Sequence, residues 1–130
     1  DVPSLAFSLC DFTPDADFDS TKHVAHKLAK KVLENGLPKG VCLNVNIPVG
    51  EVKGLRITTQ TQGKWVNEYH RSKDGGDRDV FWMTGNFENG ETDNDKNDEW
   101  ALSNGCAAAV PVKIDMTAYD YIRELRDWEI

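Results

Sequence analysis

The sequence is poor in cysteine and contains no long apolar run. Its 130 residues include three cysteines, Cys10, Cys42 and Cys106, and no Cys-x-x-Cys pair. An odd number of widely spaced cysteines argues against a disulfide scaffold and favours a reducing compartment, so we expect a cytoplasmic protein. No stretch approaches the roughly 20 apolar residues that span a bilayer, and no basic segment of a signal peptide is present. The chain enters a strand-like run directly after Asp1, which suggests a fragment.

The sequence also has too little positive charge for a nucleic-acid-binding domain. Twenty-two acidic residues against fifteen basic ones give a formal net charge of −7. Proteins that bind DNA or RNA polymers carry a basic stripe, so neither is an expected partner. The lysines of residues 22–31 fall on one predicted helix, which is typical of a solvated helix face. A small phosphorylated ligand stays compatible with the acidic balance, because one local site can oppose the overall charge.

Catalytic and metal-binding motifs are missing as well. There is no P-loop, GxGxxG, HExxH or GxSxG segment. The acidic run 93–97 resembles the start of a calcium-binding EF-hand loop. However, Asp98 and Asn104 stand where that loop needs Gly and Glu. We expect His23 and His26 to face water, because the apolar stripe of their helix lies elsewhere. The sequence therefore assigns no catalytic residue and no metal ligand within the chain.

The first half reads as a strand, a helix and a strand. Residues 2–9 and 41–48 are short apolar runs bounded by turn signals. Between them, a helix capped by Ser20 or Asp19 is predicted to end at Asn35. A strand–helix–strand crossover builds parallel sheets. The fold class is therefore α/β, with a mainly parallel, Rossmann-like sheet. The helix stripe comprises Val24, Ala25, Leu28, Ala29, Val32 and Leu33.

The middle of the chain changes to β character. Residues 52–60, 64–71 and 79–84 are β runs, and the last two flank a Gly-Gly turn at 74–77. Two β runs around such a turn predict a protruding hairpin. The acidic, asparagine-rich residues 86–99 are predicted to form a surface loop.

The last part returns to helices around one strand. A short helix is predicted to start at Asp98, capped by that residue or by Asn97. A strand over 106–114 follows. Thr117 is predicted to cap a final helix over 118–128. Its apolar face comprises Tyr121, Ile122, Leu125 and Trp128.

Three polar residues are candidates for a place next to substrate. Asn44 and Asn46 project from one face of their predicted strand. They either tie down a neighbouring loop or lie near a ligand, since ligands of open α/β sheets bind beyond the carboxyl ends of the strands. The same rule points to Ser8, near the carboxyl end of the first strand.

Four aromatic residues gather on the predicted hairpin. An isolated hairpin is marginal in water, so one with this much aromatic area packs either on its own domain or on another subunit. Aromatic residues are enriched in interface cores, which makes these four candidates for an oligomer interface: Trp65, Tyr69, Phe81 and Trp82.

The order of segments resembles the C-terminal portion of the SurE (survival protein E) nucleotidases. The similarity covers nearly the whole chain, in order. It is carried by residues 2–9, 33–40, 43–48, 53–58 and 110–120. The resemblance implies a parent hydrolase, a 5′-nucleotidase or acid phosphatase, that acts on nucleoside 5′- and 3′-monophosphates with Mg²⁺ or Mn²⁺. The family's metal ligands are implied to lie upstream of Asp1, so the chain alone is expected to be inactive.

The resemblance also implies an organisation and an assembly. Residues 1–60 would be the remaining strand–helix–strand part, residues 61–96 the oligomerisation hairpin and loop, and residues 97–130 the closing helix and strand with an exchanged C-terminal helix. Homodimers or homotetramers would form through the hairpin and through Tyr121 and Trp128. An alternative of another class is a non-catalytic oligomerisation or binding module.

Overall fold

A four-stranded mixed sheet forms the body of the protein. The computed structural model describes residues 2–128, so parts of the predicted segments 1–60 and 97–130, namely residues 1, 129 and 130, lie outside it. The strand order is β1-β2-β8-β3. β1 pairs with β2 and β3 with β8 in parallel, whereas β2 and β8 are antiparallel. The α/β prediction is confirmed, with parallel pairs in the majority. The strands are β1 (Ser4–Leu9), β2 (Val41–Ile47), β3 (Gly54–Ile57) and β8 (Cys106–Lys113).

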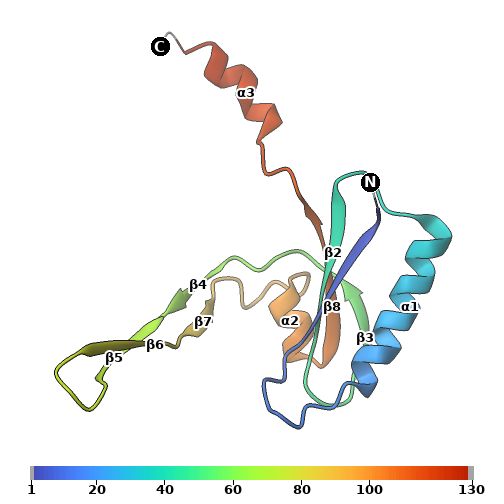
Figure 1. Ribbon diagram of the computed structural model, residues 1–130. Coiled ribbons are helices and arrows are strands. Elements are labelled where there is room, and N and C mark those ends of the chain that lie inside the picture. Colours follow the sequence, from blue (N-terminus) through green and yellow to red (C-terminus); the bar gives the residue numbers. More distant parts are fainter. Residues whose placement is uncertain (1, 129–130) are drawn as a thin grey trace.

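Helix α1 (Asp19–Asn35) covers one face of this sheet. Its apolar residues recur every four positions and therefore lie on one side of the helix. On β2 every second residue is buried, as expected when one strand face meets a helix. Figure 1 shows α1 lying along the sheet beside β1 and β2. The resulting core contains Val24, Leu28, Val32, Leu43, Val45 and Ile47.

The predicted cap of α1 is wrong. The helix begins at Asp19, and Phe18 in the preceding position makes no side-chain cap. The Asp17 carboxylate accepts the Asp19 N–H at 2.9 Å instead. Ser20 lies inside the first turn, where its hydroxyl donates to the Gly50 carbonyl at 3.3 Å. Ser20 therefore ties the start of α1 to the segment that follows β2.

The predicted hairpin is a longer arm made of two ladders. Residue 67 interrupts the predicted run 64–71, because Asn67 adopts a left-handed φ of 54°. Asparagine tolerates this conformation better than most residues do. The prediction that residues 86–99 form a loop throughout is wrong, since their first four residues are a strand. Figure 1 shows the arm, residues 63–89, projecting from the body. The pairs are β4 (Gly63–Val66) with β7 (Asn86–Asn89), and β5 (Tyr69–Lys73) with β6 (Asp79–Met83).

The buried side chain of Asn97 fixes the junction between the arm and helix α2 (Asp98–Ser103). Its amide oxygen accepts the Trp100 N–H at 2.8 Å, which confirms the predicted cap. Its amide nitrogen donates to the Glu91 carbonyl at 3.1 Å. Asn97 is 0% exposed, so both bonds are shielded from water.

Helix α2 packs against β8 on the sheet face opposite α1. Ala101 of the helix and Ala108 of the strand are both fully buried, and such small side chains allow close approach. The Asp98 carboxylate accepts the Thr61 N–H at 2.9 Å and also binds its hydroxyl. The root of the arm is thereby held to α2.

Helix α3 (Tyr119–Arg126) leaves the body after β8. The predicted Thr117 cap is wrong, because the helix shows no side-chain cap and the Thr117 N–H donates to Asp115 at 2.9 Å. Hydrogen bonds from Thr117 and Tyr119 lower the pKa of the Asp115 carboxyl to about 2. The helix buries no residue, so its predicted apolar face is open. Within residues 2–128, no helix has the length and apolar character needed to cross a membrane.

Candidate functional site

Two of the three substrate-site candidates lie side by side at one edge of the sheet. β1 and β2 are parallel and end at the same edge, and Ser8 is the direct partner of Asn46. Asn44 stands two residues earlier on β2, beside Ala6. Leu43, Val45 and Ile47 of β2 pack in the core with α1. Side chains alternate between the two faces of a strand, so the three candidates share the opposite face of the sheet. We call Ser8, Asn44 and Asn46 the polar face.

The polar face is open, and its amides are not engaged. Ser8 is exposed, and Asn44 and Asn46 are half-buried. Among residues 2–128, neither asparagine side chain makes a hydrogen bond, so neither ties down a loop in the described part of the chain. Uncommitted amide groups beside a hydroxyl at the carboxyl edge of parallel strands suit the binding of a polar ligand.

A thiol and a carboxyl lie close to the same edge. The Cys10 N–H donates to the Ile47 carbonyl at 2.9 Å and extends the β1–β2 ladder. Burial raises the pKa of the Cys10 thiol, and the nearby Glu99 carboxylate raises it further. The thiol is therefore kept protonated and weakly nucleophilic. Burial and then Asp98 raise the pKa of Glu99. Glu99 was not a predicted site residue, because only the packing of α2 on the sheet brings it here.

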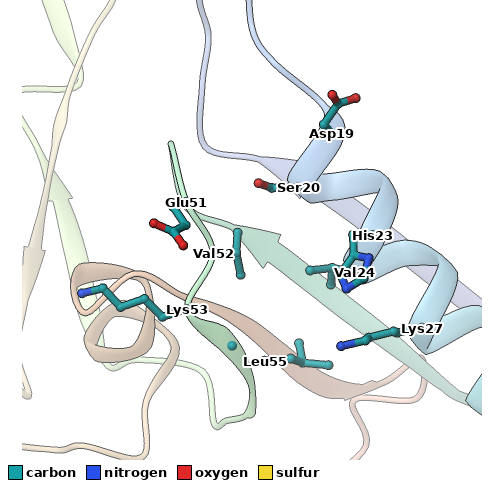
Figure 2. Close-up of a pocket in the computed structure, with 10 residues that line it drawn as sticks. Asp19, Ser20, His23, Val24, Lys27, Glu51, Val52, Lys53 and Leu55 are labelled. Atoms are coloured by element: carbon teal, nitrogen blue, oxygen red, sulfur yellow. The ribbon is translucent and has the colours of Figure 1, made fainter.

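A cavity lies on the other face of the sheet. It has a volume of about 440 Å³ and opens between the start of α1 and the segment after β2. Figure 2 shows the Lys27 side chain reaching toward Leu55, while Lys53 extends away. His23 lies at this opening and is exposed, as predicted. The cavity holds none of the polar-face residues. Its lining is Asp19, Ser20, His23, Val24, Lys27, Glu51, Val52, Lys53, Gly54 and Leu55.

The aromatic residues predicted for an interface remain on the surface. Trp65 packs its ring edge-on against Phe87, with ring centroids 5.8 Å apart. The Trp82 indole N–H donates to the Ser72 hydroxyl at 2.8 Å. These local contacts leave most of the aromatic area uncovered, so the arm presents an apolar surface. Its exposed members are Trp65, Tyr69, Phe81, Trp82 and Met83.

The described residues offer no ligand set for a divalent cation. Between residues 2 and 128, no group of three or more His, Cys, Asp and Glu side chains is arranged to hold a metal ion. Hard cations such as Mg²⁺ bind carboxylate and other oxygen ligands, and the polar face supplies only one hydroxyl and two amides. These residues by themselves therefore do not fit a divalent cation.

A profile of the family described as Survival protein SurE matches residues 1–67, just over half of the chain. The chain belongs to the SurE family. The 5′-nucleotidase SurE of Bacteroides fragilis is 45% identical over 130 residues, which cover 99% of this chain and 51% of that protein. The 5′-nucleotidase SurE of Phocaeicola vulgatus is 43% identical over 130 residues, with the same coverage.

A solved SurE structure has the same architecture. The crystal structure of the SurE protein from Aquifex aeolicus matches with a TM-score of 0.73 and 29% identity. The match covers 95% of this chain and 50% of that one. The chain thus spans about half the length of the SurE proteins it matches.

Proposed function

We propose that this chain is part of a divalent-metal-dependent phosphohydrolase that acts on nucleoside 5′- and 3′-monophosphates, and that the polar face adjoins its substrate. Membership of the SurE family and relatives named 5′-nucleotidase support this activity. The proposed location of the substrate rests on the pairing of Ser8 with Asn46 at the carboxyl edge of β1 and β2. The Mg²⁺ or Mn²⁺ ligands and the catalytic groups would come from polypeptide outside these 130 residues.

In this proposal the chain's own residues position the substrate. The Ser8 hydroxyl and the Asn46 amide donate hydrogen bonds to phosphate or ribose oxygens, and Asn44 forms the adjoining wall. Donors fixed on two paired strands need little reorganisation as charge develops on a transferring phosphoryl group. The cation, when bound, would supply the charge that these neutral groups lack.

Replacing Asn46 should weaken substrate binding. In the complete polypeptide that contains this chain, Asn46→Ala is expected to raise KM for a nucleoside monophosphate by roughly 10–100-fold, the value of a hydrogen bond to a charged group. Steady-state kinetics of phosphate release measure the effect, and a melting curve establishes that the variant is folded. Asn35→Ala, at the far end of α1, is the control. A folded Asn46→Ala variant with unchanged KM and kcat would remove Asn46 from the substrate site.

We propose further that copies of the chain associate as homodimers or homotetramers through the arm and α3. Helix α1 covers β1 and β2 but leaves Ile57 of β3 67% exposed. Beside β3 runs a groove whose rim on α1 is basic and whose floor includes Leu28 and Leu55. The rim carries His23, His26, Lys27, Lys30 and Lys31, and also the carboxylate of Glu34, which pairs with Lys31 at 3.4 Å.

Helix α3 of a second copy fits this groove in chemistry and in length. Its open apolar face is flanked on one side by the acidic residues Asp120, Glu124 and Asp127, and on the other side by Arg126. Eight helical residues extend about 12 Å, and the four residues of β3 about 13 Å. The same open surfaces favour the alternative function, a non-catalytic oligomerisation module. Only the kinetic experiments separate that alternative from the nucleotidase.

Disrupting the apolar face of α3 should dissociate the assembly. Leu125→Asp in the complete polypeptide places a charge within this face, so we expect smaller particles than those of the unmodified protein in sedimentation velocity at micromolar concentration. Arg123→Asp changes the net charge by more than Leu125→Asp does, but on the opposite side of the helix. It is therefore expected to leave the assembly intact. Equal dissociation by both variants would point to charge alone and contradict docking through the apolar face.

A further inference from the structure

The loop that joins β1 to α1, residues 10–18, lies at the same edge as the polar face. Figure 1 shows it passing beyond the ends of β1 and β2. Its root is fixed by the backbone bond from Cys10 to Ile47. Its first turn is fixed by Asp11, whose carboxylate accepts the Thr13 N–H at 2.9 Å and the Thr13 hydroxyl at 2.7 Å. The loop therefore holds a defined shape beside the candidate substrate site.

Between these two anchors stands an aromatic ring that the fold leaves in water. Phe12 is 94% exposed. Single exposed apolar residues are common on protein surfaces, so the exposure alone indicates nothing. The position is informative, because Phe12 follows Ser8 by four residues. Four residues span at most about 14 Å, which is of the order of the length of a nucleotide.

The charge of the loop indicates which end of a nucleotide it faces. Residues 10–18 include Asp11, Asp15 and Asp17 and no basic residue. Hydrogen bonds from the Thr13 backbone and hydroxyl lower the pKa of Asp11, which keeps that carboxylate ionised. Three carboxylates repel a phosphate group. A nucleotide at this edge is therefore favoured with its phosphate toward Ser8 and its uncharged base toward the loop.

We propose that Phe12 stacks on the base of the bound nucleoside monophosphate, while the phosphate lies beside Ser8 and Asn46. This inference rests on the proposed function. Every nucleobase offers a flat face to an aromatic ring, so Phe12 would strengthen binding of nucleotides over sugar phosphates without selecting one base. Phe12 is thus a specificity-determining residue for the presence of a base.

The test compares a substrate that has a base with one that lacks it. In the complete polypeptide that contains this chain, assayed with Mn²⁺, Phe12→Ala is expected to lower kcat/KM for adenosine 5′-monophosphate by roughly 5–20-fold, as a lost stacking contact would. The value for ribose 5-phosphate should stay unchanged. Phe12→Trp should restore the activity on the nucleotide. Phe18→Ala, in the same loop but directly before α1, is the matched control.

The outcomes separate this inference from the proposed function. Equal losses on both substrates, or a selective loss in Phe18→Ala alone, would overturn the assignment to Phe12. If the unmodified protein hydrolyses neither substrate, the proposed function fails, and binding of adenosine 5′-monophosphate by titration calorimetry decides the inference. Weaker binding by Phe12→Ala would then support stacking. Equal binding by both proteins, or no binding by either, would overturn it.

Discussion

Residues 1–130 produced alone are expected to hydrolyse no nucleoside monophosphate above the rate without protein, with either Mg²⁺ or Mn²⁺ present. The polar face supplies hydrogen-bond donors but no carboxylate cluster, and residues 2–128 contain no group of side chains arranged to hold a cation. Enzymes accelerate their reactions by about 10⁶-fold or more, so separating the chain from the cation ligands proposed to lie outside it should remove nearly all activity. Phosphate release from adenosine 5′-monophosphate measures the difference from the complete polypeptide.

The control for this experiment is the folded state of the isolated chain. β1 is an edge strand of the sheet, with one side of its backbone unpaired. Such edges recruit other strands, so we expect the isolated chain to associate rather than to sediment as a stable monomer. Circular dichroism should still report both helix and strand. Robust metal-dependent turnover by the isolated chain would show that its own residues bind the cation, and would contradict the proposed division of the site.

Asn97→Ala should destabilise the protein by about 2–4 kcal/mol. Loss of a helix cap costs roughly 0.5–2 kcal/mol, and a buried group left without its partner roughly 1–3 kcal/mol. Both costs apply, because the substitution removes the acceptor of the Trp100 N–H and the donor to the Glu91 carbonyl in a fully buried position. The midpoint of urea unfolding, converted with the measured slope, gives the loss in free energy.

Asn104→Ala is the matched control at the other end of α2. Its side chain also makes a bond within the helix, to the Trp100 carbonyl at 2.8 Å, but it is exposed to water. Water can replace that bond, so the loss should stay below about 1 kcal/mol. Similar losses for the two variants would mean that the burial of Asn97 contributes little to stability.

The body of the fold could be predicted because its signals are local. Apolar and polar residues alternate along 41–47, and apolar residues recur every four positions along α1. Each pattern predicts one apolar face, and the two faces meet in the core. The cap at Asn97 was predictable for the same reason. Strand β7 was not. The residues Asn86–Asn89 carry weak β propensity and are held by pairing with β4, where Phe87 lies opposite Trp65. The Thr117 cap failed because Asp115 binds the threonine instead.

The candidate site was predictable only in part. Ser8 and Asn46 meet because parallel strands end together, a rule that applies once a strand–helix–strand unit is recognised. The place of Glu99 depends on β8 entering between β2 and β3, so that β8 and β3 together run opposite to β1 and β2. No periodicity in the sequence indicates that β8 lies between β2 and β3. The exposure of Phe12 likewise depends on which surfaces the loop leaves uncovered.

The insertion of β8 also constrains the order in which the protein can fold. β1, α1 and β2 are consecutive, so their contacts can form as soon as residue 47 has emerged from the ribosome. β3 is made next, but its neighbour in the sheet is β8, and the whole arm and α2 are made between them. Closing so long a loop carries an entropy cost, and pairing of distant strands is slow. We therefore expect the nascent chain to hold a docked first unit and an unattached β3 until β8 is complete.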